Sequence, residues 1–148
     1  KLVFVVHNEH YTERVMGWDV TEGGLKIVLS AEVPALAGQP LRDAVASFLS
    51  EHDLALADIG VWLAHPGGPK VIDEMETHLG LAPGTLDASR RSLQEKGNLS
   101  SVSVLLILDA FFQQSPPPPG TYGVLLAMGP AFCAELVPPR TIDQLRNM

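Results

Sequence analysis

The segment from Ser100 to Phe112 constrains the fold more than any other part of the chain. It predicts a helix whose surface is apolar almost all round, at Val102, Val104, Leu105, Leu106, Ile107, Leu108, Phe111 and Phe112. A helix without a polar face has to be buried on every side, which favours a layer between two sheets. A chain of 148 residues supplies a single sheet of that size. We therefore expect the second sheet to come from elsewhere.

Short segments rich in apolar and β-branched residues predict the strands. They span residues 2–6, 15–20, 25–29, 59–64, 122–128 and 132–137. The second and third, separated by Thr21-Glu22-Gly23-Gly24, predict a hairpin, and the last two, joined by Gly129-Pro130-Ala131, predict an antiparallel pair. We expect Val33-Pro34 to end the hairpin's second strand and Pro138-Pro139 to close the sheet.

Helical spacing of apolar residues predicts a helix over residues 41–54 that covers the sheet, and another over 71–79. A short polar helix over 89–96 is expected to end at a left-handed Gly97. Glu74, Glu76 and His78 indicate a solvated helix face, on which Glu74 and His78, four residues apart, form a weak pair. The order strand, strand, helix, strand, helices, strand, strand indicates an α/β fold.

Composition and charge bound the class of protein. The length and the 46% hydrophobic content fit one globular domain. A net charge of −7, with scattered basic residues, argues against nucleic acid as the main partner. The longest apolar run is too short to span a bilayer and no signal peptide opens the chain, so we expect no membrane partner.

The single cysteine, Cys133, excludes an internal disulfide and fits a reducing, cytoplasmic compartment. We expect its side chain to be a small buried apolar group. Because the chain begins with Lys1, directly in a predicted strand, we expect a preceding part to be missing. His7, Glu9 and His10 lie close together in one loop and no well-spaced ligand accompanies them elsewhere, so we expect no metal site.

A titratable ring stands at the end of a predicted strand in the segment His65-Pro66-Gly67-Gly68-Pro69. The carboxyl ends of strands are where ligands bind in open α/β sheets, and the two glycines let a ligand approach the backbone. The alternative is a structural turn with an incidental histidine.

Asn98 precedes the apolar helix, within Gly97-Asn98-Leu99-Ser100-Ser101. Its simplest interpretation is a helix N-cap. Together with His65 it has a second one, because a histidine at a strand end and an asparagine at a helix start can supply two hydrogen-bond donors to one small cavity. That is what an oxyanion hole requires.

Three segments carry a resemblance to a known family. The stretches 62–69, 90–101 and 122–130 resemble the C-terminal half of type III polyketide synthases, the chalcone and stilbene synthase family. The resemblance covers Gly17 to about Val137, and Gly17-Trp18-Asp19-Val20 resembles the bacterial members. It implies a thiolase-like fold, here a mixed sheet of about five strands with a buried helix packed on it. Residues 1–140 would form this half-domain and 141–148 a tail.

The resemblance also implies a chemistry. Such enzymes use a Cys-His-Asn triad, and His65 and Asn98 match the histidine and the asparagine. The nucleophilic cysteine belongs to an N-terminal half that this chain lacks, so we expect no turnover by the chain alone. The implied reaction joins an acyl-CoA starter to malonyl-CoA by decarboxylative Claisen condensation, with coenzyme A thioesters as substrates and no cofactor. We expect a homodimer when the enzyme is complete.

Further residues match substrate positions of the family. Gly67, Gly68, Pro69 and Lys70 are expected to bind coenzyme A, with Lys70 or Arg90 near its phosphates unless both are solvated surface residues. The expected cavity and gate residues are Ile27, Ser100, Met128, Gly129 and Pro130. Ile27 falls where plant enzymes have an aromatic gatekeeper, which is compatible with a longer or bulkier starter.

Two alternatives stay open. One is a relative of β-ketoacyl-ACP synthase III, which has the same fold and triad, although the Gly-Gly-Pro after His65 speaks against it. The other is a non-catalytic thiolase-like partner domain, in which His65 and Asn98 would not face a common cavity.

Overall fold

The computed structural model describes residues 14–114, 117–129 and 133–141. The strand predicted over 2–6, the residues His7, Glu9 and His10, the cavity residue Pro130 and the tail 142–148 lie outside this range. Within it, no helix is long and apolar enough to cross a bilayer.

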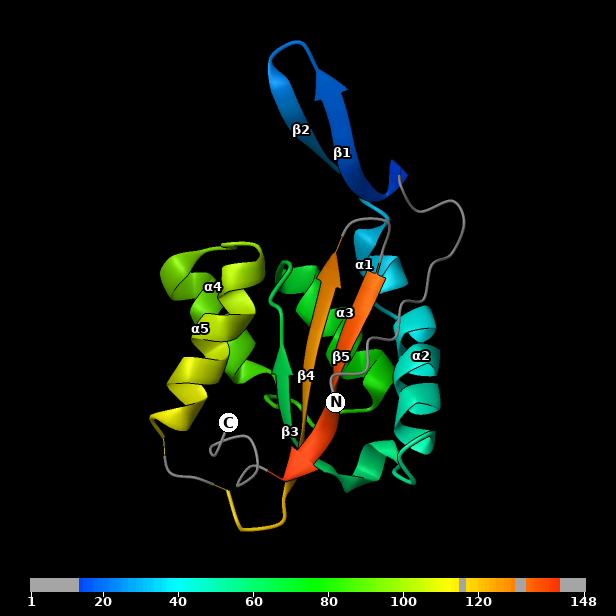
Figure 1. Ribbon diagram of the computed structural model, residues 1–148, viewed down its shortest axis with the longest axis vertical. Coiled ribbons are helices and arrows are strands. Elements are labelled where there is room, and N and C mark those ends of the chain that lie inside the picture. The colour runs from blue at the N-terminus through cyan, green and yellow to red at the C-terminus, as the bar shows by residue number, and fades with distance from the viewer. Residues whose placement is uncertain (1–13, 115–116, 130–132, 142–148) are drawn as a thin grey trace.

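The predicted hairpin is confirmed. Strands β1 (Met16–Thr21) and β2 (Gly24–Leu29) pair antiparallel, with Trp18 opposite Ile27. The turn is shorter than predicted because Thr21 and Gly24 are themselves paired. Gly24 has a φ of 112°, which favours glycine. The hairpin projects from the rest of the molecule (Figure 1).

Two helices follow the hairpin. The prediction that Val33-Pro34 ends a strand is wrong, since Val33 begins the short helix α1 (Val33–Leu36). A proline is accepted there because the first N–H groups of a helix have no partner within it. Helix α2 (Gln39–Ser50) begins and ends earlier than predicted, and its buried residues are those at the predicted spacing: Leu41, Ala44, Val45, Phe48 and Leu49.

The larger sheet has the order β3-β4-β5. After the short 3-10 helix η2 (Leu56–Asp58), β3 (Ile59–Ala64) pairs parallel with β4 (Tyr122–Gly129), which pairs antiparallel with β5 (Cys133–Thr141). The sheet is therefore mixed, and the five described strands fall into two sheets. Pro138-Pro139 does not close it: β5 continues through both prolines, which an edge strand tolerates, with a register irregularity nearby.

Three helices connect the parallel strands β3 and β4: α3 (Pro69–Leu79), α4 (Asp87–Lys96) and α5 (Ser101–Phe112). Gly97 after α4 has a positive φ of 75° but an extended ψ of −172°, so the predicted left-handed cap is wrong there. The left-handed cap is Gly80 after α3, with φ 67° and ψ 30°.

The core lies between the three-stranded sheet and helices α1 to α3, and it includes Phe48, Trp62, Ile72 and Met75. Helix α5 contacts β3 and β4 and buries Val104 and Ile107. Its other side remains open: Val102 is 48% exposed and Leu105 57%. The described chain thus buries one side of α5, and cover of the other side by a second sheet stays a prediction.

Charged side chains tie α4 to α3. Arg90 donates to Asp73 at 2.7 Å and to Glu76 at 2.6 Å, and these hydrogen bonds, Glu76 first, raise the pKa of Arg90. The other oxygen of Glu76 accepts the N–H of Leu86 at 2.9 Å. Glu76 and Arg90 are therefore partly buried and bonded between the helices, and the expectation that they lie free on a solvated surface is corrected.

The expected pair of Glu74 with His78 is confirmed, with Glu74 Oε2 and His78 Nδ1 3.2 Å apart.

Candidate active site

The candidate site lies where the parallel strands β3 and β4 end. His65 directly follows β3, and its N–H donates to the carbonyl of Leu126 in β4 at 2.8 Å. Met128 and Gly129, two predicted cavity residues, form the end of β4. The α4–α5 connection and the hairpin lie at the same end of the sheet (Figure 1). The prediction that His65 stands at a strand-to-helix turn is confirmed, since α3 begins at Pro69.

The two glycines after His65 differ in whether the backbone and its neighbours require glycine. Gly67 has a φ of 28°, and a Cβ added to it would lie 3.1 Å from Val71 Cγ1, so the fold itself requires glycine. Gly68 is extended, and a Cβ added to it would meet no atom within 4 Å. The chain leaves open space at Gly68.

Asn98 ties the two candidate segments together. Its Nδ2 donates to the carbonyl of Gly67 at 2.9 Å, and its Oδ1 accepts the N–H of Ser100 at 2.9 Å. Asn98 is not the N-cap of α5, because Ser100 occupies that position and makes no side-chain capping bond. The capping interpretation is wrong, and Asn98 instead joins the loop after His65 to the loop before α5.

Ser100, a predicted cavity residue, has a φ of 56°. A residue with a Cβ rarely adopts this conformation, and such positions cluster at functional sites. Next to it, the Leu99 N–H donates to Ser103 Oγ at 2.8 Å. The backbone before α5 is thus held by two side chains of its own segment.

The surroundings of His65 set its protonation state. The ring is partly buried, and this burial lowers the pKa of His65 from its ordinary value. At neutral pH the imidazole is therefore uncharged and keeps one N–H to donate. The Asn98 amide carries two N–H groups, of which one bonds to Gly67 and the other has no acceptor among the described residues. Each of the two side chains thus has an uncharged N–H group as a donor.

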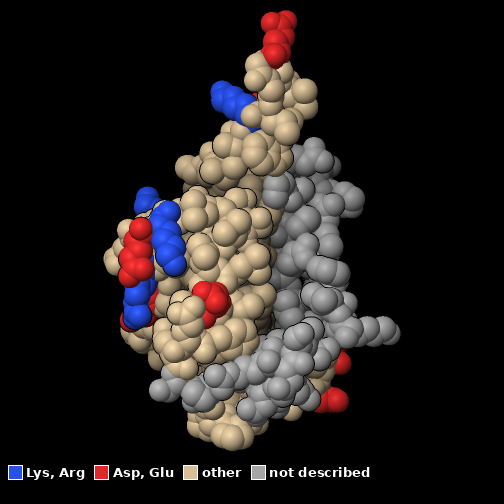
Figure 2. Space-filling view, turned by 60° about the vertical axis from the view of Figure 1, so that its left-hand side comes forward, with Lys and Arg blue, Asp and Glu red and all other residues tan. Residues whose placement is uncertain are grey.

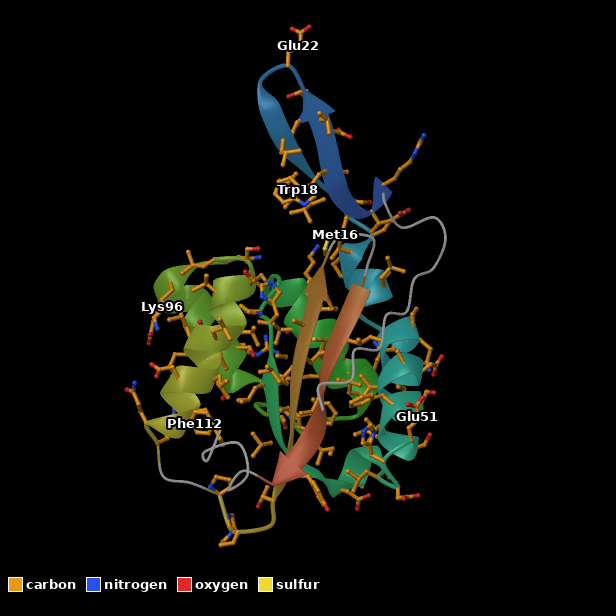
Figure 3. The ribbon with its side chains drawn as sticks, in the orientation of Figure 1. Met16, Trp18, Glu22, Glu51, Lys96 and Phe112 are labelled. Atoms are coloured by element: carbon orange, nitrogen blue, oxygen red, sulfur yellow. The ribbon has the colours of Figure 1, made fainter. Side chains whose placement is uncertain are left out.

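Ile27, the predicted gate residue, lies on the hairpin and is 51% exposed. Strand alternation and the pairing register place it on one hairpin face with five other apolar residues, Met16, Trp18, Val20, Leu25 and Leu29. We call these six residues the apolar hairpin face. Figure 3 shows Met16 at the hairpin's base, Trp18 further out and Glu22 at the tip.

The remaining predicted residues are placed as follows. Pro69 and Lys70 are exposed in the first turn of α3. Met128 is partly buried and packs against the core. The prediction for the Cys133 side chain lies outside the described residues.

Sequence reasoning missed Ser89. Its hydroxyl is fully buried in α4 and donates to the carbonyl of Ala64 at 2.6 Å, directly before His65. The signal was the spacing of Ser89 and Ser92, which puts two small side chains on one face of a helix that otherwise reads as polar.

The chain matches the chalcone and stilbene synthases, C-terminal domain, over residues 8–142. It is 47% identical over 126 residues to a 1,3,6,8-tetrahydroxynaphthalene synthase of Streptomyces peucetius subsp. caesius, covering 85% of this chain and 33% of the relative. It is 40% identical over 126 residues to a putative chalcone synthase of Bacillus subtilis, covering 85% of this chain and 34% of that protein.

Solved structures agree. The crystal structure of 1,3,6,8-tetrahydroxynaphthalene synthase from Streptomyces coelicolor, a bacterial type III polyketide synthase, aligns with a TM-score of 0.84 at 30% identity. The alignment covers 93% of this chain and 39% of that one. A polyketide synthase of the brown alga Ectocarpus siliculosus aligns with a TM-score of 0.81 at 26% identity, covering 95% of this chain and 38% of that one.

These neighbours share the thiolase-like fold, and this chain spans about a third of the length of the curated relatives it matches. The resemblance to the bacterial type III polyketide synthases is confirmed. The chain belongs to the chalcone and stilbene synthase family, of which it contains the C-terminal domain.

Proposed function

We propose that this domain supplies the decarboxylation half of an acyltransferase site, in which His65 and Asn98 hold the thioester carbonyl of malonyl-CoA. The observation that carries the proposal is the bond from Asn98 to Gly67, two residues after His65. It brings a neutral imidazole and a primary amide to one loop at the carboxyl end of β3. Two such donors suit an enolate oxygen better than a ground-state carbonyl.

The proposed reaction balances as follows. The bond between the malonyl carboxylate and the α-carbon breaks, CO2 leaves, and the electron pair forms an enolate whose oxygen accepts from His65 and Asn98. The α-carbon then attacks an acyl group carried on a cysteine thioester. The carbon–sulfur bond of that thioester breaks, giving a β-ketoacyl-CoA and a cysteine thiolate. The cysteine belongs to the proposed N-terminal half.

Helix α5 supports the need for that half. Leu99, just before α5, is 47% exposed, and Val102 and Leu105 in its first turns are 48% and 57% exposed. In Figure 2, which brings the α4–α5 side forward, most charged residues gather at one edge, and an acidic group stands alone on the otherwise uncharged described surface below the hairpin. An uncharged apolar helix face is suited to packing against a matching half-domain.

Coenzyme A is proposed to lie along the loop after His65. The open space at Gly68 leaves room for a pantetheine arm against the backbone, and the exposed Lys70 is the proposed partner of a phosphate. Arg90 is bound to Asp73 and Glu76, so we assign it no contact with coenzyme A.

The proposed acyl cavity is bounded by Ser100, by Met128 and Gly129 and by the apolar hairpin face with Ile27 as its gate. An aliphatic gate favours a long or bulky starter. The only substrates proposed are thioesters of coenzyme A, without a further cofactor.

We propose that residues 1–140 form the half-domain and 141–148 its tail, and that the complete enzyme is a cytoplasmic homodimer. The single cysteine of the chain is compatible with a reducing compartment.

The proposal is tested with the full coding sequence that contains this chain, by measuring CO2 release from malonyl-CoA. His65→Ala and Asn98→Ala should each lower the rate about 100-fold or more, since one oxyanion donor is worth about 3 to 4 kcal/mol. His78→Ala is the matched control: this histidine pairs with Glu74 on the next helix and should leave the rate unchanged.

Unchanged CO2 release by both site variants would favour the non-catalytic partner domain. A preference for malonyl carried on an acyl carrier protein over malonyl-CoA would favour the β-ketoacyl-ACP synthase III relative.

A further inference from the structure

The peptide group between Ala64 and His65 is held from both sides. Its N–H, on His65, donates to the Leu126 carbonyl of β4 at 2.8 Å. Its carbonyl, on Ala64, accepts the Ser89 hydroxyl of α4 at 2.6 Å. The N–H and the carbonyl of one peptide point in opposite directions, so β4 and α4 hydrogen-bond to this peptide group from opposite sides.

The carbonyl of Ala64 needs this partner. Among the described strands, β3 is an edge strand that pairs with β4 alone, so a carbonyl pointing away from β4 has no strand to bond. Ala64 is 1% exposed and Ser89 0%, which leaves no access for solvent to take over. Ser89 thus satisfies a buried acceptor that would otherwise cost stability.

The bond from Ser89 also fixes the orientation of the peptide group that precedes the His65 Cα. Pro66, which is fully buried, follows His65 and restricts its backbone to extended conformations. With the preceding peptide plane held by Ser89 and Leu126, both sides of the His65 Cα are constrained. The direction of its Cβ, and hence of the imidazole, follows from them.

Helix α4 is itself anchored next to Ser89. Arg90 bonds to Asp73 and Glu76 of α3, and Glu76 accepts the N–H of Leu86 just before α4 begins. The position of the Ser89 hydroxyl is therefore set by α3, which starts four residues after His65.

We propose that Ser89 is a positioning residue for His65, one that acts on malonyl-CoA decarboxylation by holding the peptide from which the imidazole projects. This inference rests on the proposed function of His65. Ser89 itself touches no substrate in this proposal.

The test compares Ser89→Ala, Ser89→Cys and Ser92→Ala in the full coding sequence. Ser92 is the matched control: it lies one turn further along α4, and its buried Oγ has no hydrogen-bond partner among the described residues. The cysteine variant nearly preserves the volume of Ser89 but is only a weak donor. The rate and the KM of CO2 release from malonyl-CoA and the melting temperature are measured for each.

We expect both Ser89 variants to lower kcat about 10- to 100-fold with KM changed less than about twofold, because misplacement of a reacting group acts on the chemical step. Ser92→Ala should keep the wild-type kcat. If Ser89→Ala does not fold, the cysteine variant alone decides.

A wild-type kcat in the folded Ser89 variants would overturn the inference, as would an equal loss in Ser92→Ala. His65→Ala separates this failure from that of the proposed function: if it abolishes CO2 release while the Ser89 variants do not, only the role of Ser89 is wrong.

Discussion

The three-stranded sheet and the β1–β2 hairpin use the same strand geometry in opposite environments. In the sheet, Trp62 and Val124 are 5% and 1% exposed beneath helices α1 to α3. In the hairpin, the paired residues Val20 and Leu25 are 85% and 69% exposed. Both regions have apolar side chains gathered on one face, but the described chain covers only one of them.

This difference teaches that an alternating pattern fixes which side chains share a face and leaves open what packs on it. The apolar hairpin face and the outer side of α5 are apolar surfaces that the described part of the chain leaves uncovered. Monomeric proteins rarely keep contiguous patches of this kind in water. We expect the N-terminal half to cover both, and the candidate site to lie between them.

The largest expected effect tests whether the exposed side of α5 is covered in the full-length protein. A Leu105→Asp change should destabilise the full-length protein by about 3 kcal/mol or more, because it would place an unpaired carboxylate in a buried interface. Urea unfolding measures this difference. Gln94→Asp, at an exposed position on α4, is the control and should shift the free energy of unfolding by less than about 0.5 kcal/mol. An equally small effect at Leu105 would mean that α5 stays open to solvent.

A smaller effect tests the hairpin, where neighbouring residues point to opposite faces. Leu25 belongs to the apolar hairpin face, and Lys26 lies on the other. In the full-length protein, Leu25→Ala should cost about 2 kcal/mol if the apolar face is covered, and Lys26→Ala less than about 0.5 kcal/mol. Thermal unfolding of the two variants gives the comparison directly. Equal costs would show that the hairpin projects freely in the complete protein as well.

Local patterns predicted the elements well. The strand over 59–64 was predicted to the residue. The hairpin and the antiparallel pair of β4 and β5 were found because the two strands of each pair lie close together in sequence. Two of the errors fell on prolines, whose effect depends on their place: Val33-Pro34 begins a helix, and Pro138-Pro139 lies within an edge strand. Sequence alone does not tell a breaking proline from a tolerated one.

The candidate site was predicted in part. The resemblance singled out His65 and Asn98, but the N-cap interpretation of Asn98 failed because its partner, Gly67, is 31 residues away. Ser89 and Arg90 were missed as bonded residues for the same reason: their partners lie on other elements. A hydrogen bond between distant residues produces no periodic pattern in the sequence, whereas the burial of one apolar face of a helix or strand does.

The smallest expected effect concerns His65, at the end of the sheet near the hairpin. Burial lowers the pKa of His65 below its ordinary value of about 6.5. As the pH falls through that value, the unfolded chain therefore takes up a proton before the folded one does. The free energy of unfolding therefore decreases from about pH 6.5 down to the lowered pKa. Below the lowered pKa, His65 causes no further decrease. Above about pH 6.5, His65 contributes nothing to the pH dependence of the free energy of unfolding.

The measurement is urea unfolding of the full-length wild type and of His65→Gln at pH 7.5 and 5.5. The wild type should lose more stability than the variant between these values, by well under about 1.4 kcal/mol per pH unit, because solvent screens the partly exposed ring. Taking the difference between the two proteins removes the carboxylates, which titrate in both. An identical loss would mean that His65 is as solvated in the assembled protein as in the unfolded chain. A larger loss would mean that the hairpin and the N-terminal half bury the ring further, as the proposed closed site requires.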